Sequence, residues 1–156
     1  MYGTLKNRNV EEFVKQFYLN ELAITDPKEI DLEAIAYVKS ARIKEEPLKG
    51  CEARIVGAGD RAIITVNSES SIERKKFSIG HELGHWFKDR GKVGDLCSKK
   101  DMDENSKGIK PKEKIANQFA SELLIPNYLL MKQINGKHLA RKTKVHGLRR
   151  WLPMRP

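Results

Sequence analysis

Two histidines and a glutamate form the most distinctive chemical pattern in this sequence. His81 and His85 stand four residues apart in the segment FSIGHELGHWF, and Glu82 directly follows the first histidine. On an α-helix, residues four positions apart differ by about 40° around the axis, so both imidazoles would lie on one side. Glu82 would lie about 100° further round, where it could reach a water held by a metal without binding the metal itself. The pattern predicts a metal site with its own general base.

This combination of side chains suits hydrolytic chemistry on zinc. Zinc lowers the pKa of a bound water to about 7, and a neighbouring glutamate can take the proton as the oxygen attacks a carbonyl carbon. Gly84 lies inside the same helical segment, although glycine costs up to about 1 kcal/mol relative to alanine there. A bare backbone at that position is reasonable if another element must approach closely.

A third metal ligand must come from elsewhere in the chain. The extended pattern that adds a glycine and a third histidine is not met, because Lys88 and Gly91 stand at those positions. Glu113, in the segment EKIANQFASELL, is the best candidate. Four other residues of the intervening segment remain alternatives: Asp95, Cys97, Asp101 and Asp103.

The surroundings of Glu113 on a helical wheel favour it as the ligand. Glu122, the other acidic residue in this segment, falls on the opposite side of the helix. Small or polar residues lie beside Glu113 on the wheel, and the alanines among them would allow the helix to lie close to Gly84: Ala116, Asn117 and Ala120.

Periodicity and turn signals place these residues on regular elements. The spacing of apolar residues predicts helices over 10–22 and 25–40, and the segment 41–46 is expected to form an edge strand. Strands over 52–56 and 61–66 flank a glycine-containing turn and predict a hairpin. A long helix over 68–89 carries the histidines, and Ser70 followed by Glu73 has the form of a capping box.

The second half of the sequence is expected to be helical after a polar connection. Residues 88–112 show little periodicity, and so long a connection is often functional. Helices are predicted over 112–125, before Pro126, and over 127–134. The order of elements predicts an α+β fold, with a small antiparallel or mixed sheet packed on the histidine-bearing helix and further helices on either side.

Composition limits the class of protein. A chain of 156 residues, with 39% hydrophobic and 33% charged residues, fits one soluble domain. We find no secretory signal at the N-terminus and no apolar run of about 18 residues that could span a membrane. Cys51 and Cys97 are far apart and are expected to be free thiols in a reducing cytoplasm.

The net charge of +9 is concentrated at one end of the chain. We therefore expect a domain over 1–131 and a basic tail over 132–156, either helical or disordered. Such a tail is either a solvated end or a surface that contacts nucleic acid or an acidic partner. After Glu122 no acidic residue occurs, and all the charged residues are basic: Lys132, Lys137, Arg141, Lys142, Lys144, Arg149, Arg150 and Arg155.

Taken together, several segments resemble the ImmA/IrrE family of metallopeptidases. The resemblance is carried by Arg74, FSIGHELGH at 77–85 and EKIANQFASELLIP at 113–126, with DLEAIA at 31–36 and AIITVN at 62–67 also similar. It covers roughly residues 10–131 and weakens beyond them, where HLARKTKVHG departs from the family's pattern.

The resemblance implies a zincin-like minimal peptidase fold and a set of site residues. His81, His85 and Glu113 correspond to metal ligands and Glu82 to the catalytic acid/base. Asn117 also matches the family's pattern, and we expect it either to pack within the site or to contact one of the metal ligands. Zinc is the expected metal, and the same ligands could hold manganese or iron.

The resemblance further implies a substrate. Such a peptidase would cut a transcriptional repressor and so switch on mobile-element or stress-response genes. No helix-turn-helix is evident in this chain, so a helix-turn-helix repressor would be a separate protein. The rival interpretations are a catalytically silent regulatory module that binds a DNA-associated regulator, or a toxin–antitoxin partner built on the peptidase fold.

Overall fold

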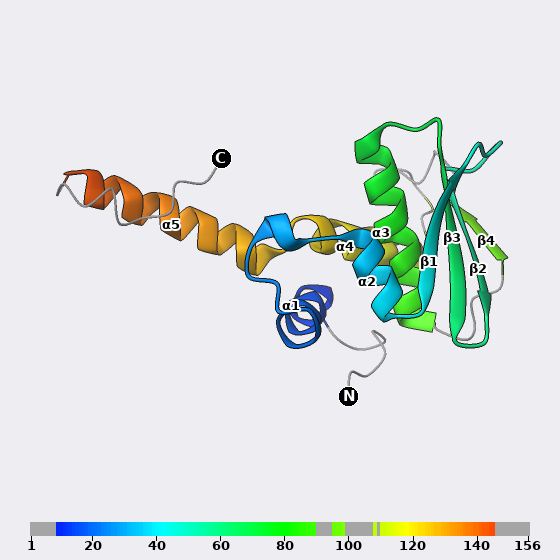
Figure 1. Cartoon of the computed structure of the whole chain (residues 1–156), viewed down its shortest axis with the longest axis horizontal. Helices are drawn as coiled ribbons and strands as arrows, with labels where there is room; N and C mark the ends of the chain where they lie inside the picture. The colour runs from blue at the N-terminus through cyan, green and yellow to red at the C-terminus, as the bar shows by residue number, and fades with distance from the viewer. Residues whose placement is uncertain (1–8, 90–94, 99–107, 109, 146–156) are drawn as a thin grey trace.

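The computed structural model describes residues 9–89, 95–98, 108 and 110–145, with the backbone alone for 95–98 and 137–145. The chain begins with three helical segments: α1 (Val10–Glu21), the short 3-10 helix η2 (Pro27–Glu29) and α2 (Leu32–Val38). Three strands follow: β1 (Ala41–Glu46), β2 (Ala53–Ala58) and β3 (Arg61–Asn67). The remaining elements are α3 (Ile72–Asp89), β4 (Asp95–Ser98), α4 (Pro111–Leu124) and α5 (Asn127–Val145) (Figure 1).

The strands form one mixed sheet in the order β1-β3-β2-β4. β1 runs parallel to β3, whereas β2 runs antiparallel to both β3 and β4. The α+β fold, the hairpin of β2 and β3, and the edge position of β1 are as predicted. β4 was not predicted, because it lies in the polar segment 88–112 and is defined by its pairing with β2.

α3 lies between the sheet and the other helices (Figure 1). α3 contacts β2 and β3 of the sheet. Leu83 and Trp86 of this helix are fully buried, and the indole N–H of Trp86 donates to the carbonyl of Lys39 at 2.8 Å. On the other side, aromatic rings from three helices meet edge to face or tilted, with centroids 4.9–6.3 Å apart: Phe13 and Phe17 of α1, Phe87 of α3 and Phe119 of α4. These rings join α1, α3 and α4 into one core.

The starts of two helices differ from the sequence prediction. The segment 25–40 is not one helix, because the Asp31 carboxylate accepts from the backbone of Glu33 and Ala34 and starts α2 there. At α3 the cap is one residue later than predicted: the Ser71 hydroxyl accepts from the backbone N–H of Arg74 at 3.2 Å. The Ser70 hydroxyl instead donates to the carboxylate of Glu52 at 2.6 Å, so the Ser70–Glu73 capping box is not formed.

The expectation of a free thiol is wrong for Cys51, which is disulfide-bonded. It lies just before β2, in the connection from β1. The cysteines therefore do not support the argument from sequence for a reducing compartment.

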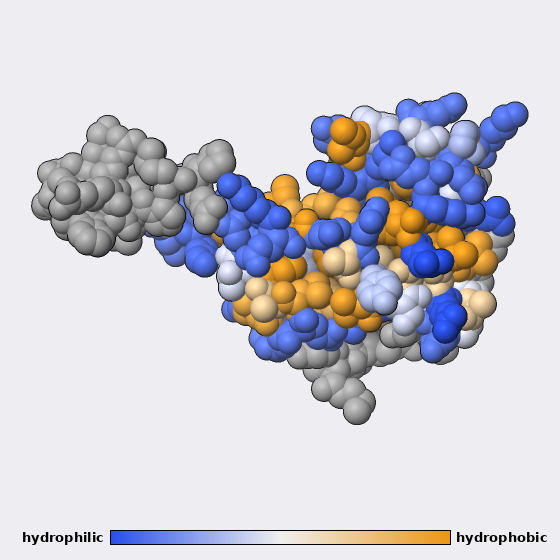
Figure 2. Space-filling view, in the orientation of Figure 1, coloured by the Kyte–Doolittle hydropathy of each residue, from blue (hydrophilic) through white to orange (hydrophobic). Residues whose placement is uncertain are grey.

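The last helix is longer than predicted. α5 continues past residue 134 to Val145, so the first part of the basic tail is helical, and it projects away from the sheet (Figure 1). Within the described part of the chain, no helix combines the length and the apolar character needed to cross a bilayer. On the face seen in Figure 2, apolar residues gather in the middle and hydrophilic residues cover most of the end at which α3 begins.

Candidate metal centre

The two histidines and the glutamate of the HExxH pattern lie on the buried part of α3. His81 and His85 are each 3% exposed, and Glu82 is 1% exposed. The one-turn spacing places both imidazoles on one face, with ring centroids 4.8 Å apart and the two Nε2 atoms 3.1 Å apart. The predicted juxtaposition of the two rings is confirmed.

Glycines allow α4 to approach this part of α3 closely. A Cβ added at Gly84 would lie 3.0 Å from the Cα of Ala116 and 3.1 Å from the Cβ of Phe119. A Cβ at Gly80 would lie 3.0 Å from the Cα of Ala120. Any side chain at either glycine would push the helices apart, as predicted for Gly84; the structure adds the second contact one turn earlier.

The close approach of α4 brings Glu113 to the two imidazoles. Its Oε2 atom lies 2.9 Å from Nε2 of His81 and 3.1 Å from Nε2 of His85. Glu122, which the helical wheel placed opposite, instead accepts from the backbone N–H of Asn127 at the start of α5. The other proposed ligands lie outside the described side chains: Asp95, Cys97, Asp101 and Asp103.

The arrangement of the three ligand atoms fits a tetrahedral metal ion. With bonds of about 2.0–2.1 Å to nitrogen and oxygen, the ligands of tetrahedral zinc lie about 3.3 Å from one another. The three distances among the Nε2 atoms and the Glu113 oxygen are 2.9–3.1 Å. His81, His85 and Glu113 therefore could bind one metal ion through one atom each.

Asn117 determines which nitrogen of His81 is available. Its amide oxygen lies 2.7 Å from Nδ1 of His81, and an amide oxygen can only accept, so Nδ1 carries the proton. In the neutral ring, Nε2 then presents a lone pair toward the Glu113 carboxylate, which is also an acceptor. Two acceptors at this distance require a cation between them, either a proton or a metal ion.

The pKa shifts of His81 and Glu113 also indicate that this site favours a positive charge beside the carboxylate. Burial lowers the pKa of His81, but the hydrogen bond to Glu113, the charge of Glu82 and the contact with Asn117 outweigh it, so the pKa is raised overall. Hydrogen bonds from His81 and His85 hold the pKa of Glu113 well below its usual range, against the effect of burial. The site is therefore built to hold an anionic carboxylate beside a cation.

Comparison with protein families agrees with this geometry. The family model of the IrrE N-terminal-like domain, a peptidase family, matches residues 37–142. The chain belongs to the IrrE N-terminal-like family. No curated protein matches the sequence.

The family match supports metallopeptidase activity and covers the whole metal centre. The matched range, residues 37–142, differs at both ends from the range 10–131 expected from the sequence. α1 lies outside the matched range, and most of α5 lies inside it. The three residues that could bind the metal, His81, His85 and Glu113, were singled out from the sequence, together with Glu82 and Asn117. Glu52 was not, although its side chain is buried.

Nothing in the local pattern signals the burial of Glu52. In a strand, alternate residues share a face, and Glu52 shares its parity with Arg54 and Val56, which are both exposed. Its burial follows from the approach of the residues that lead into α3.

Proposed function

We propose that this chain is a zinc-dependent endopeptidase that hydrolyses one peptide bond in a protein substrate. The observation that carries the proposal is the convergence of two imidazoles and one carboxylate, with the Glu82 carboxylate buried beside them on the same helix. A purely structural metal site has no need of that additional carboxylate. The donor set would also accept manganese or iron.

The residues of the centre divide the work of hydrolysis. A metal held by His81, His85 and Glu113 would supply Lewis acidity toward water and the scissile carbonyl. Glu82 accepts a proton from the attacking water and delivers it to the leaving amine. Asn117 keeps the proton of His81 on Nδ1, so that Nε2 stays directed at the centre.

The substrate is expected on the side of α3 that faces β2 and β4. Arg74 lies on the same face of α3 as the histidines and reaches Glu52, just before β2. Lys75, on another face, pairs instead with Glu45 of β1. An extended substrate beside β4, which is the outer strand on this side, would gain backbone hydrogen bonds without much dependence on sequence.

We further propose that the substrate is a helix-turn-helix transcriptional repressor encoded separately. Support comes from the family resemblance and from the absence of acidic residues after Glu122. The basic residues of α5 and the segment after it would contact the phosphates near a DNA-bound repressor weakly and in a salt-dependent manner. Such a substrate would place the protein in the cytoplasm.

Incubation with candidate repressors, with and without a chelator, tests the proposal by mass spectrometry of the products. We expect zinc-dependent cleavage by the wild type and none by Glu82→Gln, which keeps all three metal ligands. Glu73→Gln, an exposed change in the first turn of the same helix, is the matched control and should cleave normally. If Glu82→Gln retained full biological function, the chain would act as a binding module or a toxin–antitoxin partner and not as a peptidase.

A further inference from the structure

The disulfide of Cys51 closes a covalent loop around the helix that carries the HExxH pattern. Cys51 is disulfide-bonded, and the only other cysteine of the chain is Cys97. The bond therefore joins the segment just before β2 to β4, the strand that contains residue 97. The part of the chain between the two cysteines contains β2, β3 and all of α3.

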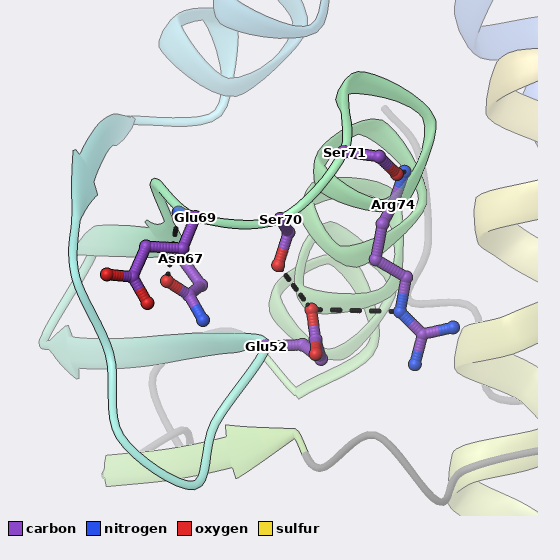
Figure 3. A pocket seen from close by; sticks show the side chains of 6 residues that line it. All are labelled: Glu52, Asn67, Glu69, Ser70, Ser71 and Arg74. Carbon is purple, nitrogen blue, oxygen red and sulfur yellow. Dashed lines mark hydrogen bonds and ion pairs between the residues drawn. The ribbon is translucent and has the colours of Figure 1, made fainter.

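The backbone at one end of this bond is held by several hydrogen bonds. The side-chain nitrogen of Asn67 donates to the carbonyl of Cys51 at 3.5 Å and to that of Leu48 at 3.3 Å. The backbone N–H of Asn67 donates to the carbonyl of Glu52 at 2.9 Å. The buried side chain of Glu52 accepts from the hydroxyl of Ser70 at 2.6 Å (Figure 3). None of these contacts involves a sulfur atom, so they remain when the disulfide is reduced.

The other end of the bond lies in an element with fewer attachments. β4 is a strand of four residues at the outside of the sheet. Among the described elements, β2 is the one with which β4 has extensive contact, through their antiparallel ladder. An element with few contacts opens locally at a low cost in free energy. The disulfide is therefore the second link that holds β4 to the sheet.

The proposed substrate gives a reason for this bond to be reversible. A peptidase that cuts a DNA-associated repressor works in a compartment that keeps thiols reduced. Disulfides in such a compartment are usually transient and either catalytic or redox-sensing. Cys51 is partly exposed, as reduction of the bond requires, and it lies beside the sheet rather than among the metal ligands.

We propose that the disulfide between Cys51 and Cys97 is a reversible redox switch that controls the binding of substrate at β4. In the oxidised form two links hold β4 beside β2, so that its outer edge can add an extended substrate strand. In the reduced form only the ladder remains, and β4 is in place for a smaller fraction of the time. The effect on cleavage rests on the peptidase function proposed above, whereas the effect on β4 does not.

The reductant in the switch is a dithiol. One of its thiolates attacks a sulfur of the protein disulfide, forms a mixed disulfide and releases the other cysteine as a thiolate. The second thiol of the reductant then displaces the remaining cysteine and closes the reductant's own disulfide. Two electrons and two protons pass from the dithiol to the protein, which gains two thiols. Exchange with a disulfide of the same class reverses the reaction.

Alkylation and amide hydrogen exchange, both read by mass spectrometry, test the switch without a substrate. The zinc-loaded full chain should be alkylated at its cysteines only after treatment with a water-soluble phosphine, which reduces disulfides without adding a thiol that could bind zinc. Reduction should speed exchange in the peptide that covers 95–98 about tenfold or more, as for the loss of a cross-link. Exchange in α3 should not change, because α3 also contacts β3 and α4.

Cleavage kinetics test the consequence for the substrate, with a peptide that contains the site found in the repressor assay. Reduction should raise KM about tenfold with little change in kcat, because the apparent affinity falls with the population of the binding-competent state. Zinc affinity should not change, because the three ligands lie outside β4.

Matched variants separate the bond from the reductant. Cys97→Ser should show the high KM of the reduced wild type both with and without the phosphine. Ser98→Ala changes the next residue of β4 and keeps both cysteines, so it should respond to the phosphine as the wild type does. If Cys97→Ser does not fold, the reduced wild type supplies the same comparison.

The outcomes distinguish the two proposals. The switch would be overturned if the oxidised protein held free thiols, or if reduction changed neither exchange at 95–98 nor KM. Release of zinc on reduction would also overturn it, because the bond would then act on the metal centre. If the wild type cleaved no substrate in either redox state, the peptidase function would fail, and the exchange measurement would still decide whether the bond holds β4.

Discussion

At the scale of single residues, the centre depends on the contact between two helices at His81. Both of its ring nitrogens are engaged by one turn of α4, Nδ1 by Asn117 and Nε2 by Glu113. Because these two α4 residues are four positions apart, they lie on one face of the helix, and each contacts a different nitrogen of the His81 ring. Glu113, and Asn117 which orients the His81 ring, are therefore both positioned by the same turn of α4.

Asn117→Ala should weaken zinc binding without removing a ligand. Loss of the partner that fixes a metal-bound histidine typically costs 10–100-fold in metal affinity, because the ring can then rotate and exchange its tautomer. Zinc affinity is measured by competition with a chromophoric chelator. Gln118→Ala, an exposed change on the same helix, is the control, and an equal loss in both variants would contradict the role of Asn117.

The stability of the metal-free protein should depend on pH in both directions. The pKa of Glu113 is lowered from 4.5, so its stabilising contribution is present above pH 4.5 and is lost as pH falls through the lower folded value. The pKa of His81 is raised from 6.5, so its contribution is present below pH 6.5 and is lost as pH rises through the higher folded value. The pair therefore stabilises the metal-free fold most fully between about pH 4.5 and 6.5.

Denaturant unfolding of the chelator-treated protein across this pH range provides the measurement. Glu113→Gln should make the free energy of unfolding depend less on pH, both below about pH 4.5 and above about pH 6.5. Glu33→Gln, an exposed change in the first turn of α2, should leave the wild-type curve in place. A wild-type curve that Glu113→Gln does not flatten would show that the pair is not coupled to folding.

At the scale of elements, the decisive feature is the approach of α4 to α3 at Gly80 and Gly84. The contacts leave no room for a Cβ at either position without a shift, since the nearest atoms belong to the backbone of Ala116 and Ala120. Glycine is a poor helix former, and its presence twice in the middle of α3 is explained by this contact. The same approach determines how far Glu113 lies from the histidines.

Gly84→Ala should destabilise the protein and weaken metal binding together. An overpacked contact costs about 1–3 kcal/mol in the free energy of unfolding, and moving α4 outward would separate Glu113 from the imidazoles. Denaturant unfolding and zinc titration are the measurements. Gly136→Ala is the matched control in α5, where an added Cβ meets nothing within 4 Å, so it should be neutral or stabilising by up to about 1 kcal/mol.

At the scale of the whole molecule, the metal centre joins two parts of the chain that are distant in sequence. α3 is attached to the sheet, and α4 reaches the same centre after the segment 90–110. A metal ion bound by His81, His85 and Glu113 would therefore connect the two helices directly. Metal binding should be coupled to global stability as well as to activity.

Zinc at 100 times its dissociation constant should raise the free energy of unfolding by about 2.7 kcal/mol over the chelated protein. Thermal unfolding with and without chelator measures this as a shift in Tm. Glu113→Gln should reduce the shift strongly, whereas Glu122→Gln on the same helix should retain it because Glu122 faces the start of α5. Equal shifts in the two variants would place the metal elsewhere.

The sequence by itself determined the features that depend on short-range spacing. The one-turn separation of His81 and His85, the hairpin of β2 and β3, and the wheel position of Glu113 follow from local helix and strand geometry. The small residues near Glu113 and the glycine at 84 also predicted that the two helices would meet. These features need only the period of one element and the types of its residues.

Only the tertiary structure decided what depends on partners distant in the chain. β4 has little strand character of its own and exists through its ladder with β2. Three other features also depend on residues distant in the chain: the disulfide of Cys51, the burial of Glu52, and the capping of α3 by Ser71 instead of Ser70. Ser70 could cap a helix or bond a distant carboxylate, and the hydrogen bond to buried Glu52 decided between them, because a buried charge is costly without its partners.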